Sequence, residues 1–176
     1  MRQTQAKWLD IWWPGGWQFA SSTMTEATKN LKFLRKPSPV LAEHRPLYKI
    51  CQILLVLNIA SRSGRSRLPR LHLFNWALKS PERCQQLIVA SREKLLRVRA
   101  WGFDPALAIA IRFAIAEGLI RETSTSYELT DKGTLFVTEI LKIPDHFSNE
   151  KRILGEIGKG ITENMVENVA KGWEAS

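Results

Sequence analysis

Cysteine and histidine are scarce in this sequence, and their scarcity excludes several kinds of site. The 176 residues include two cysteines, Cys51 and Cys84, and three histidines. Neither type occurs in a Cys-x-x-Cys pair or at another metal-ligand spacing, so we expect no metal site. Each cysteine stands alone in a predicted helix, which favours buried, reduced thiols in a cytoplasmic protein.

Motifs of catalysis and of nucleotide binding are also missing. Gly64 lies in a polar loop, but no strand precedes it and no Lys-Ser/Thr pair follows it, as a Walker-type phosphate loop requires. A nucleophile elbow is absent. Asp145 and His146 are adjacent in sequence, which does not make them a catalytic pair. We therefore expect no catalytic residue and no cofactor, and we predict that the chain is not an enzyme.

Long apolar runs are absent too. The most apolar stretch, residues 50–60, is interrupted by Cys51, Gln52 and Asn58 and is shorter than the roughly 18 residues that cross a bilayer. The first residues show no apolar core followed by a small-residue cleavage site, so no signal peptide is expected. These observations predict a cytoplasmic protein without a membrane partner.

Acidic residues are few in the middle of the chain, and the charge is therefore asymmetric. Residues 41–101 hold 12 lysines and arginines against 3 acidic residues, whereas residues 102–176 hold 8 against 12. The whole chain carries a net charge of +9. The asymmetry predicts an acidic partner for the middle stretch, either nucleic acid or a negatively charged protein.

The most informative stretch that is present, residues 103–141, begins with a helix. Asp104 is a typical N-cap, Pro105 suits the first helical position, and Gly118 is typical of the residue that ends a helix. Between them lie almost only Ala, Leu, Ile and Phe, with Arg112 as the one charge before Glu117. We expect this helix to be buried on most sides, so that Asp at position 111 or 113 would unfold the domain.

A hairpin and a second helix follow. Two short strands, 119–122 and 127–129, flank a polar tip of four residues, which is a normal hairpin connection. Thr130 then caps a further helix, and Asp131 lies in its first turn, near the positive helix end. Helix, strand, wing, strand and helix in this order predict the second half of a winged-helix domain.

Further elements are predicted on both sides of this stretch. Before it we expect helices from Pro46 to about Ser61, from Leu68 to Leu78 and from Pro81 to about Ser91. Residues 95–101 alternate between apolar and basic side chains, which predicts a third strand beside the hairpin. The fold class is therefore mainly α with a small β wing (α+β). We divide it into a Trp-rich N-terminal extension (1–40), a winged-helix domain (41–143) and a C-terminal helical segment (144–176).

The two flanking segments are candidates for partner docking. The N-terminal extension has many tryptophans and no core of its own, so they need a surface to cover, on this domain or on a partner; they are Trp8, Trp12, Trp13 and Trp17. In the C-terminal segment, Ile161 and Met165 belong to an apolar face at helical spacing. That face either packs on its own domain or binds a partner.

Arginines form the third candidate site. Arg62, Arg65, Arg67 and Arg70 fall within nine positions, in a predicted loop and at the start of the next helix. Three alternatives stay open: a solvated loop, contact with DNA phosphates without sequence preference, or docking on an acidic protein surface. Three further arginines are candidates for the same contacts, namely Arg97, Arg99 and Arg121.

The predicted helix 105–117 argues against base reading. A helix that reads DNA in the major groove needs Arg, Lys, Asn, Gln or Ser on its exposed face. This helix offers only Arg112, and the hairpin tip is neutral. The sequence therefore favours a winged helix that binds protein.

Residues 44–143 resemble the middle component of bacterial ABC-three-component systems, the group that includes Lamassu-type anti-phage defence. The resemblance is carried by Arg-Pro-Leu-Tyr-Lys-Ile at 45–50 and Leu-His-Leu-Phe-Asn-Trp-Ala-Leu at 71–78, together with the generic winged-helix stretches 117–120 and 129–133. It implies a small non-enzymatic subunit between an SMC-like ABC ATPase and an effector, often a nuclease.

Two functions follow as hypotheses. The first is an adaptor subunit that links the SMC-like ATPase to the effector in an anti-phage or anti-plasmid defence complex, with sequence-independent DNA contact. The second is a stand-alone winged-helix transcription regulator. A regulator should dimerise and bind one DNA sequence far more tightly than others, typically by about 10³-fold or more.

Overall fold

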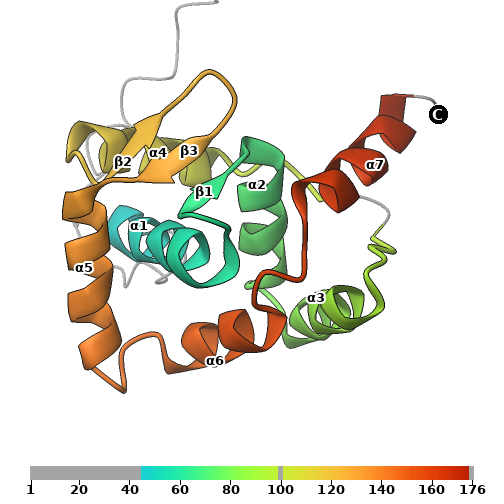
Figure 1. The fold of residues 1–176 in the computed structure, drawn as a ribbon, viewed down its shortest axis with the longest axis horizontal. Coiled ribbons are helices and arrows are strands. Elements are labelled where there is room, and N and C mark those ends of the chain that lie inside the picture. Colours follow the sequence, from blue (N-terminus) through green and yellow to red (C-terminus); the bar gives the residue numbers. More distant parts are fainter. Residues whose placement is uncertain (1–44, 99–100, 175–176) are drawn as a thin grey trace, which may run out of the picture. The chain divides into compact units, whose positions relative to one another are not determined.

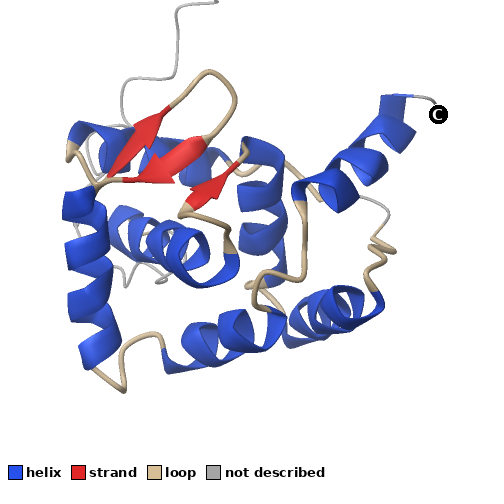
Figure 2. Ribbon diagram, viewed as in Figure 1, coloured by secondary structure: helices blue, strands red, loops and turns tan. Residues whose placement is uncertain are grey.

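A computed structural model describes residues 45–98 and 101–174, with side chains up to residue 171. Helices dominate this part of the chain and surround one small antiparallel sheet (Figures 1 and 2). The α+β fold class is therefore confirmed. The extension 1–40 lies outside the described residues.

Four helices begin where proline or a capping residue predicts a start. Each has a proline in its first turn, where a missing backbone N–H costs no helical hydrogen bond; they are α1 (Pro46–Leu55), α2 (Leu68–Ala77), α3 (Pro81–Glu93) and α4 (Pro105–Ala116). Asp104 caps α4 by accepting a hydrogen bond from the Ala106 N–H at 2.9 Å. Gly118 follows α4 with a φ of +65°, as expected for the residue that ends a helix.

The first helix forms the centre of the core. α1 continues into a π-helical turn, η3 (Val56–Ala60), and almost every residue from Ile50 to Leu57 is buried. α2, α4 and α6 (Ser148–Ile157) pack around it, as does α5 (Asp131–Lys142), which Thr130 caps as predicted (Figure 1). An all-round apolar helix is stable only when it is covered in this way.

The sheet has a different third strand from the one predicted. β2 (Ile120–Glu122) and β3 (Tyr127–Leu129) form the expected hairpin, and β3 also pairs with β1 (Arg65–Ser66), in the order β1-β3-β2. Ser63 and Gly64 have positive φ angles and turn the chain back after η3 into β1.

Residues 95–98 and Trp101, by contrast, form no strand, so that prediction was wrong. Their alternation reflects one-sided burial in an extended segment: Leu96 and Val98 pack into the core while Leu95 and Arg97 are exposed. Trp101 is buried and donates its Nε1–H to the carbonyl of Pro69 at 3.0 Å. Burial of alternate side chains on any surface gives the same pattern as strand pairing.

The last two helices pack on this same core. α6 lies against α3 and η3, and α7 (Glu163–Glu174) contacts α2. The buried apolar side chains of these two helices and of their connection belong to one continuous cluster with α1 and α4. They are Ile153, Leu154, Ile157, Ile161 and Val166. The two cysteines are buried free thiols, and burial raises the pKa of Cys51 to about 11.

Candidate functional site

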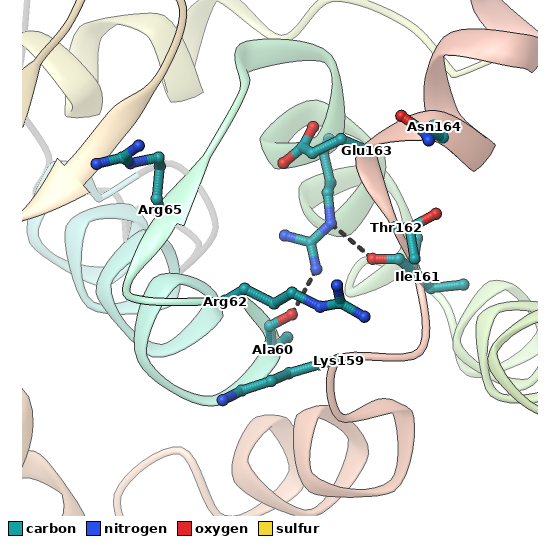
Figure 3. A pocket seen from close by; sticks show the side chains of 9 residues that line it. Ala60, Arg62, Arg65, Lys159, Ile161, Thr162, Glu163 and Asn164 are labelled. Carbon is teal, nitrogen blue, oxygen red and sulfur yellow. Dashed lines mark hydrogen bonds between the residues drawn. The ribbon is translucent and has the colours of Figure 1, made fainter.

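A basic cavity lies between the loop after η3 and the start of α7 (Figure 3). Its volume is about 280 Å³. Four of its nine lining residues are cationic and one is acidic; the full set is Ala60, Arg62, Arg65, Arg70, Lys159, Ile161, Thr162, Glu163 and Asn164. The fold therefore brings three predicted arginines, Arg62, Arg65 and Arg70, together with residues almost a hundred positions later.

Arg70 forms the inner wall of this cavity and is a structural residue. It is 3% exposed and donates hydrogen bonds to the carbonyls of Ile161 (2.9 Å) and Ala60, and to the Ser61 and Ser66 hydroxyls at 2.8 and 3.1 Å. Burial lowers its pKa to about 10, and the nearby Glu163 carboxylate opposes that shift. The predicted role of Arg70 in DNA or partner contact is wrong, because its donors are used inside the protein.

Arg65 and Arg121 share a carboxylate. The sheet register places Arg65 of β1 and Arg121 of β2 on either side of Glu128 in the central strand β3. Both arginines pair with this buried carboxylate, Arg121 at 2.7 Å, and both remain more than half exposed. Hydrogen bonding by Arg121, with the charge of Arg65, lowers the pKa of Glu128.

Two other predicted arginines are also paired within the chain. Arg67 pairs with Glu167 of α7, and its backbone N–H donates to Glu163 at 3.1 Å. The Arg97 guanidinium (Nη2) lies 3.8 Å from the carboxylate (Oε2) of Glu93, the last residue of α3. The acidic C-terminal half thus supplies part of the counter-charge that the basic middle was predicted to find in a partner. Arg99 lies outside the described residues, as do the four candidate tryptophans.

α4 is buried on one face only, which corrects the expectation that it is covered on most sides. Leu107, Ala110, Ile111 and Ala114 face the core, chiefly α1. Ile109 and Phe113, one turn apart, are 51% and 50% exposed, and Arg112 between them is exposed as well. The predicted unfolding by Asp therefore applies to position 111 and not to position 113.

The apolar outward face of α4 was missed because a helix of Ala, Leu, Ile and Phe reads as buried on every side. A signal was present nonetheless. Ile109 and Phe113 fall on the opposite side of the helix from Leu107, Ala110 and Ala114. Such a helix needs cover on two sides, and residues 45–98 and 101–174 cover only one.

The C-terminal docking candidates lie against the core. Ile161 is 1% exposed, so its side chain presents no surface to a partner, and its predicted docking role does not fit the structure. Met165 is partly buried and packs on the same cluster. Of the two alternatives left open for this apolar face, packing on its own domain is the one observed.

A polar cluster fixes the start of α4. The Asp104 carboxylate accepts hydrogen bonds from Lys79 Nζ and Asn75 Nδ2, each at 2.9 Å, and lies 3.9 Å from Lys49 Nζ. Burial opposes ionisation of Asp104, but these donors and the Ala106 N–H outweigh it and hold the carboxyl pKa well below its usual range. The cluster ties the start of α4 to α2.

Over residues 45–98 and 101–174, no group of three His, Cys, Asp or Glu side chains is arranged to hold a metal ion. Within the same ranges, no helix has both the length and the apolar character needed to cross a membrane. Comparisons with protein families, with curated proteins and with solved structures find no match to this chain.

Proposed function

We propose that the chain is a non-enzymatic adaptor subunit with a winged-helix domain, which links an SMC-like ABC ATPase to an effector, often a nuclease, in a defence complex. The partner classes come from the sequence resemblance of residues 44–143. The observation that carries the binding role is the outward face of α4, which is apolar where a base-reading helix would be polar.

The order of elements supports a winged helix. α1, β1 and α2 precede α4, and the β2–β3 hairpin follows α4 directly, with β3 pairing back to β1. In this arrangement α4 takes the position before the wing, which in DNA-reading relatives of the fold enters the major groove. α3 is an addition between α2 and α4.

The α4 face is suited to protein rather than to DNA. Ile109 and Phe113 offer apolar surface and no hydrogen-bonding group for a base edge. Aromatic and aliphatic side chains that stay exposed until a partner covers them are typical of interface anchors, and Arg112 beside them is a residue type enriched at such interfaces.

DNA contact in this proposal is sequence-independent and secondary. The exposed arginines 62, 65 and 121 lie on the η3–β1 loop and on the sheet, and none of them belongs to α4. Such cations contribute affinity for phosphates without selecting a sequence.

The test is co-purification of the full chain with an SMC-like ATPase encoded beside it. The double variant I109D/F113D should fold and lose the ATPase or the effector, because two charges would have to be buried in the interface without partners. L135D is the matched control, since Leu135 of α5 is 69% exposed; it should co-purify like wild type.

Two results would contradict the proposal. If the double variant co-purifies as well as the control, α4 is not the docking face. If the wild-type chain binds no ATPase but binds one DNA sequence about 10³-fold more tightly than unrelated ones, the transcription-regulator alternative is correct.

A further inference from the structure

We propose that the cavity between the η3–β1 loop and the start of α7 is a binding site for a phosphate group. The sequence indicated phosphate contact by the arginines of the loop alone. The cavity also contains Lys159, Thr162 and Asn164, which no sequence pattern indicated. The cavity contains no residue of α4, so the phosphate site can be tested independently of the docking role of α4.

Cations from different segments of the chain converge on the cavity. Arg62 comes from the loop after η3 and Lys159 from the connection between α6 and α7, and Figure 3 shows both side chains lying along the cavity. The guanidinium of Arg70 forms the wall behind them. Like charges brought together in this way repel each other, so an anion between them is strongly favoured.

The two outermost cations of the cavity are unpaired within the described part of the chain. Among the residues that the structure describes, Arg62 and Lys159 have neither an ion-pair nor a side-chain hydrogen-bond partner. Arg65 and Arg67, their neighbours in the fold, are both paired with carboxylates. The fold thus neutralises the arginines around the cavity and leaves open the two cations that reach across it.

Glu163, the one carboxylate of the cavity, is committed elsewhere. It accepts hydrogen bonds from the Ser66 hydroxyl and from the Arg67 N–H, both at 3.1 Å. Its charge also acts on Arg70. Because these groups hold Glu163 against the β1–α2 junction, it leaves the Arg62 and Lys159 side of the cavity electropositive.

Helix α7 starts at the cavity. Thr162 caps α7 by accepting a hydrogen bond from the Met165 N–H at 3.3 Å. Thr162, Glu163 and Asn164 at the start of α7 line the cavity, so the positive end of the helix dipole adds to the field of the cations. Arginine with helix N–H donors is the usual donor set for a phosphate.

The volume of the cavity fits a small anionic group. About 280 Å³ is below the roughly 300–1,000 Å³ of sites that enclose a drug-sized ligand. It accommodates a phosphate with its solvent rather than a whole nucleotide cofactor. The phosphate can be free in solution or carried by a nucleic-acid backbone, since the recognising chemistry is the same.

The test uses the full chain and two probes, inorganic phosphate and short DNA duplexes of unrelated sequence. The cavity variant R62Q/K159Q is compared with R92Q/K171Q, which removes the same two charges from exposed positions that do not line the cavity. Thermal midpoints of both variants establish that they fold. Binding of phosphate is followed by the amide signals of residues 162–164 in NMR spectra, and duplex binding by fluorescence anisotropy against salt.

The cavity variant should bind the probe at least about tenfold more weakly than wild type, the scale of one lost charge-assisted hydrogen bond, and the control should change little. A duplex effect that is equal across sequences, with a salt slope smaller by about 0.9 per lost phosphate contact, identifies a nucleic-acid backbone as the source. Phosphate binding without a duplex effect identifies a free phosphate.

The proposal is overturned if wild type binds neither probe, or if cavity and control variants weaken binding equally. In both outcomes co-purification with the ATPase remains an independent measurement. The cavity variant should retain that co-purification, whereas I109D/F113D should lose it, so failure of the phosphate site and failure of the docking role are distinguishable.

Discussion

The α4 helix and the basic cavity each combine one residue turned into the core with a similar residue turned to solvent. In α4 these are Ile111 and Phe113; at the cavity they are Arg70 and Arg62. In neither pair does residue type decide which side chain is buried in the core and which is accessible to a partner or ligand. Burial depends on the neighbours that the fold places around each side chain, so Arg70 is buried and Phe113 is exposed.

The largest expected effect separates the two faces of α4. I111D should destabilise the domain by about 4 kcal/mol or more, because an unpaired charge is buried in a packed helix interface. F113D should stay within about 1 kcal/mol of wild type, since that side chain is half exposed. Urea unfolding of both variants measures the difference, and equal losses would show that α4 is covered on both sides.

The second expected effect is a difference in stability between variants of Arg70 and of Arg62. R70M should cost about 3 kcal/mol, because two backbone carbonyls and two hydroxyls lose a buried donor. R62M should change stability by no more than about 0.5 kcal/mol, as is usual for exposed positions. The same unfolding experiment tests both. A loss for R62M as large as for R70M would mean that Arg62 has an internal role and is not available to a ligand.

The smallest expected effect on stability concerns Arg65 and Arg121, which are paired with Glu128. Since Arg121 and Arg65 lower the pKa of Glu128 below its ordinary value of 4.5, its stabilising contribution is present above that pH and is lost as the pH falls through the lower folded-state pKa. The stability difference between wild type and E128Q should therefore shrink below about pH 4.5. Thermal midpoints from pH 7 to pH 3 check this, and a constant difference would refute the shared carboxylate.

Local features of the fold followed from the sequence. The helix starts at Pro46, Pro81 and Pro105 and the caps at Asp104 and Thr130 were predicted, as was the 120–129 hairpin. In each case the deciding interaction joins residues a few positions apart, so the signal is complete within a short stretch. The identity of the third strand was not a local matter, because residues 95–98 and Arg65–Ser66 are both extended and only Arg65–Ser66 pairs with β3.

The candidate sites divide in the same way. From the sequence came the position of the basic loop, the absence of known catalytic motifs and the shortage of base-reading side chains in the helix 105–117, since these depend on residue type alone. Only the tertiary structure decided that Arg70 is internal, that Glu163 and Glu167 neutralise part of the loop, and that Lys159 lies beside Arg62. These pairings join residues about a hundred positions apart, and burial and charge compensation depend on which distant side chains the packed core brings together.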